Sequence, residues 1–127
     1  MSFEVTIEIP VQTYDIDFAG IVSNIVYIRW LEDLRLRLLD EYLPLNRLME
    51  NGWAPVLVET QITYKRPIKL FDKVTGRAWI SNTTKIKWQV TTEFLCNNQL
   101  AASAQQTGAL INLQSGRPVP FPDLKKV

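Results

Sequence analysis

The chain has 127 residues, 46% of them hydrophobic, which is enough to bury one core without disulfides or metals. Fourteen basic and thirteen acidic residues leave a formal net charge of +1, so charge predicts neither a nucleic-acid nor a membrane partner. The sequence contains no histidine, which excludes Ser-His-Asp and Cys-His hydrolase chemistry and histidine-bearing zinc sites within this chain. Any catalysis must therefore use carboxylates, amides and backbone groups.

Cysteine usage and apolar runs give an expectation about location. Cys96 is the single cysteine and has no partner for an internal disulfide. No charged and apolar leader opens the sequence, and no apolar run approaches the length of a membrane span. We expect a cytoplasmic protein, with Cys96 as a buried structural thiol.

The first two predicted elements are a strand and a helix. Apolar residues alternate from Phe3 to Val11, which predicts a half-buried strand that ends at or near Pro10. From Tyr27 the apolar period changes to three or four, and Pro44 should stop the helix by Leu43. The helical stripe comprises Tyr27, Leu31, Leu34, Leu38 and Tyr42.

Beyond Gly52 the apolar period returns to two, which predicts further strands. The turn residues "SNTT" at Ser81 and "CNNQ" at Cys96 favour antiparallel hairpins, and Leu100 to Leu113 forms a last long strand before an irregular tail. The predicted strand faces are Val56, Val58, Ile62 and Tyr64; then Val74, Gly76, Ala78 and Ile80; then Ile86, Trp88, Val90, Thr92 and Phe94.

This order of elements predicts one α+β domain over residues 1–127. An antiparallel sheet of about five strands must cover one long helix, because both elements carry an apolar face that needs a partner. Trp30 and Tyr27 are expected to pack in the core or against a partner subunit.

The stretch Tyr14–Arg35 carries a motif of acidic, glycine and aromatic residues: Asp15, Asp17, Gly20, Val22, Tyr27 and Glu32. It resembles the signature of hot-dog-fold thioesterases of the 4-hydroxybenzoyl-CoA thioesterase family. A weaker similarity follows at Tyr64, Pro67 and Asp72, which match a Tyr-x-x-Pro motif and an Asp that opens the next strand. The resemblance implies a hot-dog fold in which the sheet wraps around the helix.

The same resemblance implies an acyl-CoA thioesterase that needs no metal or redox cofactor. In such enzymes two subunits join their sheets edge to edge, so a homodimer or a tetramer of dimers is expected. The stretch from Val22 to Tyr27 is instead similar to the Val-Asn-Asn-x-x-Tyr variant of plant-type acyl-ACP thioesterases, with Asn24 at the second Asn and Ser23 in place of the first. Both carriers therefore remain candidates, as does a hot-dog protein that binds acyl thioesters without hydrolysing them.

The chemistry expected at this motif is attack on a polarised thioester carbonyl. Unpaired N–H groups at a helix start attract negative charge, so those of Ser23 to Ile25 are candidates for holding the oxyanion. Asp17 then acts as general base on water or as nucleophile, and the Asn24 side chain orients it or the water. Gly20 allows substrate to approach the backbone closely.

A structural interpretation competes with the catalytic one. An aspartate ahead of a helix is commonly an N-cap or part of an Asx-turn, which we expect for Asp15, whereas the resemblance favours catalysis for Asp17. Asn24 is also a candidate N-cap.

Further residues are predicted to contact substrate. From the loop and the helix these are Gly20, Ile21, Val22, Ser23, Ile25 and Tyr27. Lys65 and Arg66 would meet coenzyme A phosphates or an acidic carrier protein, unless they only solvate the strand. Glu59 is either a solvent-facing strand residue or, as in related enzymes, an acid that reaches the partner's site.

Overall fold

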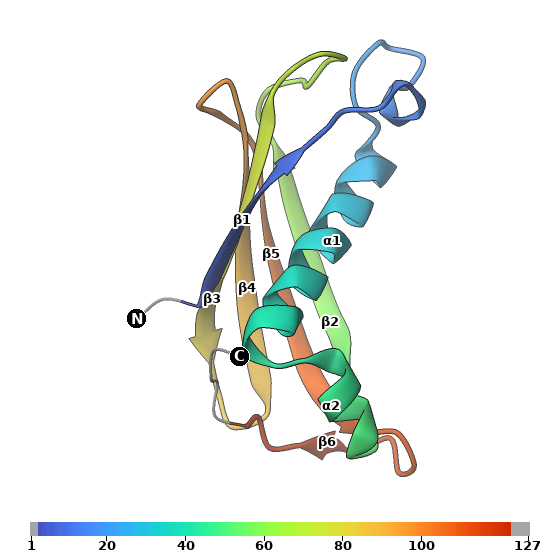
Figure 1. Ribbon diagram of the computed structural model, residues 1–127, viewed down its shortest axis with the longest axis vertical. Coiled ribbons are helices and arrows are strands. Elements are labelled where there is room, and N and C mark those ends of the chain that lie inside the picture. Colours follow the sequence, from blue (N-terminus) through green and yellow to red (C-terminus); the bar gives the residue numbers. More distant parts are fainter. Residues whose placement is uncertain (1–2, 123–127) are drawn as a thin grey trace.

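A computed structural model describes residues 3–122 and contains a long helix against an antiparallel sheet (Figure 1). The elements in chain order are β1 (Glu4–Ile9), the 3-10 turn η1 (Thr13–Asp15), α1 (Asn24–Tyr42), α2 (Leu45–Glu50), β2 (Trp53–Tyr64), β3 (Val74–Thr83), β4 (Lys87–Cys96), β5 (Gln99–Asn112) and β6 (Pro118–Val119).

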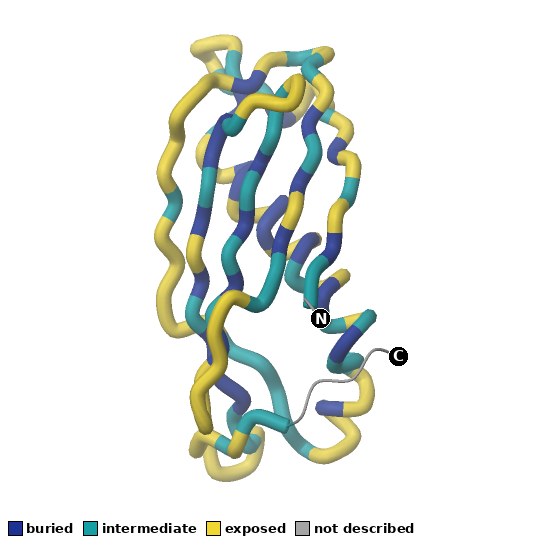
Figure 2. Tube along the Cα trace, turned by 90° about the vertical axis from the view of Figure 1, so that its left-hand side faces the viewer, coloured by how far each residue is buried: buried dark blue, intermediate teal, exposed yellow. Residues whose placement is uncertain are grey.

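The sheet has the strand order β1-β3-β4-β5-β2, and the short β6 pairs with β5. Helix α1 lies across one face of the sheet (Figure 1). This confirms the α+β hot-dog fold and adds a sixth, two-residue strand to the expected sheet. Strand β2 forms one edge and is largely exposed, as the edge opposite the N-terminal strand in Figure 2 shows.

The core lies between α1 and the inner face of the sheet. All five residues of the predicted helical stripe are buried. The helix comes close to the sheet at Gly76, where an added Cβ would lie 2.9 Å from Leu34 Cδ1. An alanine there would require the terminal methyl groups of Ile9 and Leu34 to move, and glycine lets helix and sheet pack without that shift. The predicted inward sets of β3 and β4 also share this face, except that Ile86 lies in the preceding turn.

The predicted face of β2 is wrong. The register with β5 shifts between Leu57 and Glu59, so Val58 is an extra residue in the strand. Val56 therefore pairs with Ala109, whereas Ile62 pairs with Ala104 on the opposite face. A β-bulge reverses the alternation of side chains after it, which periodicity alone does not reveal.

One of the two predicted turns is confirmed. Asn97 and Asn98 have φ values of 53° and 64° and connect β4 to β5, as two-residue hairpins of this type require. The other prediction is wrong, because Ser81 to Thr83 belong to β3. The chain turns instead after Thr84, whose Oγ1 accepts a hydrogen bond of 3.1 Å from the Lys87 N–H.

Two elements are absent from the sequence prediction. Helix α2 has six residues, too few to establish a helical period. The tail, predicted to be irregular, contributes β6 and then Phe121, whose ring stacks on Trp88 with centroids 5.3 Å apart. The rest of that tail, residues 123–127, lies outside the described residues.

Candidate active site

The loop before α1 is a small hairpin. Ile16 and Val22 form an isolated antiparallel bridge, and the Asp17 N–H donates to the Ile21 carbonyl at 2.9 Å. Gly20 closes the turn: it has φ of 78° and donates its N–H to the Asp17 carbonyl at 3.0 Å. A side chain at this φ would be strained, so glycine fixes the loop geometry.

The two aspartates of this loop differ in burial and bonding. Asp15 is 6% exposed, and its Oδ2 accepts the Gln12 N–H at 2.8 Å, which confirms a turn and capping role. Asp17 is half-buried, and its Oδ1 accepts the Ala19 N–H at 2.8 Å in an Asx-turn. The Asp17 Oδ2 forms no hydrogen bond with any described residue. Asp17 thus serves the turn with one carboxylate oxygen and keeps the other free.

At the start of α1, most of the predicted oxyanion donors already have a hydrogen-bond acceptor. Ser23, not Asn24, is the N-cap, and its Oγ accepts the Ile25 N–H at 3.4 Å. The Ser23 N–H donates to the Asp15 carbonyl at 2.9 Å and is therefore occupied. The Asn24 N–H has no acceptor within residues 3–122. The predicted set of three N–H groups is therefore reduced to one free donor, on the first residue of the helix.

A groove of about 370 Å³ lies beside this helix start. Two loops form it, and the Val22 N–H joins them by donating to the Ile68 carbonyl at 2.8 Å. Its lining contains six of the predicted site residues and two others: Ile21, Val22, Asn24, Tyr27, Lys65 and Arg66, with Tyr64 and Pro67. The added pair belongs to the Tyr-x-x-Pro motif, which was the signal available for it in the sequence.

The other predicted site residues do not line the groove. Asp17 and Gly20 belong to the turn beside it, and Ser23 is engaged as the N-cap. Ile25 is 68% exposed on the first turn of α1. Glu59 lies on β2 on the sheet face away from α1, where its Oε1 accepts a hydrogen bond from Gln61. Within its own chain Glu59 is five residues, roughly 17 Å of strand, from Tyr64.

Aromatic packing sets the polarity of the groove wall. The Tyr27 ring lies 5.1 Å from Tyr64 and 5.5 Å from Phe94, and its residue is 3% exposed, which confirms the predicted core packing. Burial, and to a lesser extent Tyr64, raises the pKa of Tyr27 to about 12. Tyr27 is therefore a neutral phenol at physiological pH. Burial followed by a hydrogen bond with Asp72 raises the pKa of the Cys96 thiol, so it is not an activated nucleophile.

Cations also line the groove. Lys65 and Arg66 are exposed, and their N–H groups both donate to the Ala101 carbonyl. Neither side chain pairs with a carboxylate of residues 3–122. Unpaired cations beside a helix N-terminus favour an anionic ligand.

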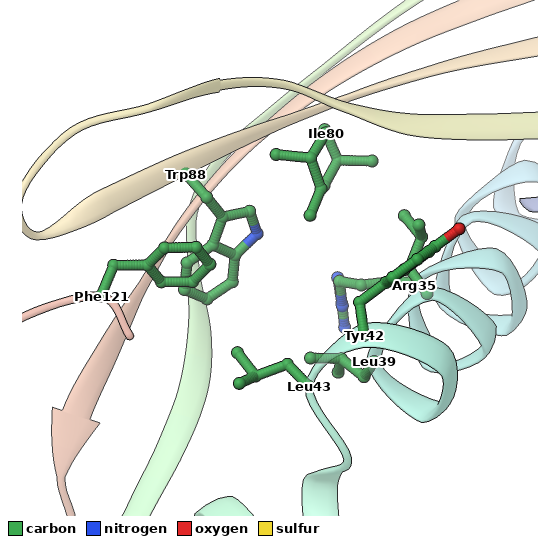
Figure 3. A pocket seen from close by; sticks show the side chains of 9 residues that line it. Arg35, Leu39, Tyr42, Leu43, Ile80, Trp88 and Phe121 are labelled. Carbon is green, nitrogen blue, oxygen red and sulfur yellow. The ribbon is translucent and has the colours of Figure 1, made fainter. Parts of the chain in front are cut away.

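A second, apolar cavity of about 20 Å³ lies at the other end of α1 (Figure 3). Leu39 and Tyr42 from the helix face Ile80 and Trp88 from the sheet across it, and Phe121 closes one side. The Arg35 side chain reaches this cavity, and burial lowers its pKa. The space holds about one water molecule, so it is a packing gap in the described structure.

No helix in residues 3–122 is long and apolar enough to cross a membrane. No cluster of three potential metal ligands occurs in the same part of the chain.

Several solved structures share this fold. A thioesterase from Thermus thermophilus, complexed with coenzyme A and zinc, is 25% identical with a TM-score of 0.79, and the match covers 93% of this chain and 90% of that one. A 1,4-dihydroxy-2-naphthoyl-CoA thioesterase from Synechocystis is 24% identical with a TM-score of 0.84, over 94% and 90% of the two chains. The probable thioesterase YbaW from Escherichia coli is 23% identical with a TM-score of 0.84, over 91% and 88%.

Sequence comparison assigns the family. No curated protein matches the chain significantly. The family profile described as the Thioesterase-like superfamily matches residues 11–125, which include the hairpin, the helix start and the groove. This chain belongs to the Thioesterase-like superfamily.

Proposed function

We propose that the protein hydrolyses acyl-CoA thioesters to a free acid and coenzyme A. The observation that carries the proposal is the unpaired Asn24 N–H, which opens on a groove that Lys65 and Arg66 also line. The N–H polarises the thioester carbonyl and stabilises the oxyanion that forms when the carbonyl is attacked. The cations bind the phosphates of the carrier.

Asp17 activates the attack. Its Oδ2 is free of hydrogen bonds to the described residues, so it accepts a proton from water, or adds to the carbonyl carbon itself. In the first route water forms the new C–O bond, the C–S bond breaks, and the thiolate leaves and is protonated. In the second route the Asp17 carboxylate displaces the thiolate, which leaves and is protonated, to form an anhydride that water then hydrolyses to the free acid and the carboxylate. The Asn24 side chain orients either the carboxylate or the water.

The acyl crevice is completed by a second subunit. Among residues 3–122 no strand pairs with the outer edge of β2, and Leu57, Val58 and Tyr64 on this strand are each at least 39% exposed. Joining two such edges pairs their backbone groups and covers this apolar surface. We propose a homodimer or a tetramer of dimers in which Glu59 faces the partner's site. Sedimentation of the purified protein as a monomer would contradict this assembly.

The hydrolytic role is tested with two aspartate variants. We expect Asp17→Asn to lower kcat for acyl-CoA by about 10²–10⁴-fold because the base or nucleophile is lost. Asp15→Asn is the matched control: an asparagine Oδ1 still accepts the Gln12 N–H, so turnover should remain near that of the wild type. Release of free thiol from panels of acyl-CoA and acyl-ACP substrates measures both. Equal turnover in Asp17→Asn would remove Asp17 from the mechanism.

A non-catalytic acyl-thioester-binding protein is the second candidate. It is favoured by one observation, that Asp17 does not line the groove. That function predicts tight acyl-CoA binding without thiol release from any substrate. Faster turnover of acyl-ACP than of acyl-CoA would support hydrolysis as the function but identify acyl carrier protein as the carrier of the substrate.

A further inference from the structure

The loop between β2 and β3 displays an isolated aromatic ring. The Asp72 N–H donates to the Lys69 carbonyl at 3.1 Å, and Asp72 Oδ2 accepts the Lys69 N–H at 2.8 Å. These two bonds brace a four-residue turn with Phe71 in its third position. Phe71 is 91% exposed, so its ring contributes little to the core.

The backbone at Phe71 is strained. Its φ is 74°, a region that glycine and asparagine tolerate and that bulky side chains rarely adopt. The other non-glycine residues with positive φ in residues 3–122 are Asn97 and Asn98, which suit that region. Strain held in place for an exposed phenylalanine indicates a role outside the core.

Cations flank Phe71 in the sequence, in a loop that begins at the groove. Lys69 and Lys73 flank Phe71 in the sequence, and Lys65 and Arg66 line the groove at the start of the same loop. All four are exposed, and none pairs with a carboxylate of the described residues. The loop is fixed to the hairpin by the hydrogen bond from Val22 to Ile68.

We infer that Phe71 stacks on the adenine of a coenzyme A thioester while the lysines of its loop bind the phosphates. The inference rests on the proposed function and names the carrier. The parts of this ligand follow one another as thioester, pantetheine, phosphates and adenine. The groove holds the Asn24 N–H, Tyr64 and the cations Lys65 and Arg66, and Phe71 follows them on the loop that continues from the groove. An acyl carrier protein offers no adenine, so Phe71 selects coenzyme A.

Substitution at Phe71 separates stacking from folding. Phe71→Gly deletes the ring and also relieves the positive φ, so the thermal midpoint should not fall. Loss of base stacking should raise KM for acyl-CoA about 10-fold. Phe71→Trp should keep the wild-type KM, whereas Phe71→Leu, which is apolar but cannot stack in this way, should behave like Phe71→Gly.

The same acyl group on N-acetylcysteamine serves as a substrate without a nucleotide. We expect kcat/KM for it to be equal in the wild type and all three Phe71 variants. Calorimetric titration with coenzyme A should show the same loss of affinity in Phe71→Gly, whether or not the protein hydrolyses thioesters. If the protein proves not to hydrolyse thioesters, the titration with coenzyme A still tests the role of Phe71.

Three results would overturn the inference. The first is an unchanged KM and coenzyme A affinity in Phe71→Gly. The second is wild-type turnover of acyl-ACP without any coenzyme A binding. The third is a change of oligomeric state in Phe71→Gly with coenzyme A affinity intact, which would assign the ring to a contact between subunits.

Discussion

The two ends of α1 differ in whether they leave polar groups accessible or bury apolar ones. At Asn24 the helix start leaves an N–H without an acceptor among the described residues, beside a groove with two free cations. At the other end, Leu39, Tyr42 and Trp88 enclose a gap of about 20 Å³, and Phe121 closes it (Figure 3). One end keeps polar groups available to a ligand, and the other removes apolar groups from water.

This contrast indicates that one helix serves catalysis and stability at separate ends. The helix is 19 residues long, so its ends lie roughly 28 Å apart. Changes at the closed end should alter the free energy of unfolding and leave turnover per folded molecule unchanged. Changes to the free polar groups at the open end should lower turnover and leave the free energy of unfolding nearly unchanged.

The largest effect is expected at the closed end. Trp88 is 5% exposed and stacks with Phe121. Trp88→Ala should lower the free energy of unfolding by about 3–5 kcal/mol because it leaves a cavity in the core. Urea denaturation measures this, with Trp88→Phe as a control that keeps an aromatic ring. A large fall in turnover of the folded Trp88→Ala protein would break the proposed separation.

The next effect is expected at the open end. Asn24→Pro removes the unpaired N–H, and a proline is well tolerated at the first helical position. Ser23 has φ of −66° and ψ of 143°, which suits a residue before proline. We expect kcat to fall about 10²–10³-fold with little change in stability.

Asn24→Ala is the matched control for this variant. It keeps the N–H and removes the side chain, so the difference between the two variants isolates the backbone donor. Turnover in Asn24→Pro equal to that in Asn24→Ala would exclude the N–H as the oxyanion donor.

A smaller effect concerns pH and Tyr27. Its pKa is about 12 in the folded protein and 10.0 in a free side chain, so the unfolded chain loses this proton first as pH rises. The contribution of Tyr27 is fully present below pH 10 and is lost between pH 10 and 12. This contribution of Tyr27 to the free energy of unfolding amounts to roughly 2–3 kcal/mol.

Comparison with Tyr27→Phe tests this pH dependence. The variant cannot titrate at this position, so its stability should fall less steeply above pH 10 than that of the wild type. Urea unfolding at pH 9, 10 and 11 measures both slopes. Parallel slopes would show that Tyr27 does not titrate differently in the two states.

The smallest effect is expected from the segment that closes the apolar gap. Phe121→Ala removes a half-buried ring that stacks on Trp88 and should cost about 1–2 kcal/mol. Phe121→Leu, which keeps apolar cover over Trp88, should cost less. Thiol release by the folded variants should match the wild type; altered acyl-chain preference would instead connect this gap to the substrate site.

Much of the fold and part of the site follow from the sequence alone. Alternation of apolar residues predicts β1, β3, β4 and β5, and the three-to-four period predicts the buried stripe of α1, because each element must bury one face. The motif of the hairpin and helix start likewise predicts four of the groove residues, Ile21, Val22, Asn24 and Tyr27, since neighbours in a short segment stay close in space. Lys65 and Arg66 are predicted from their charge.

Only the tertiary structure determined the features that depend on hydrogen bonds between segments apart in the chain. The bulge at Val58 comes from pairing with β5, and it reverses the faces of β2. The Ser23 N–H is lost as a donor because the hairpin brings the Asp15 carbonyl to it. The β2–β3 loop reaches the groove because Ile68 bonds to Val22. Local patterns fix which face of a regular element is apolar, but only the folded chain determines where a strand bulges and which polar groups remain free.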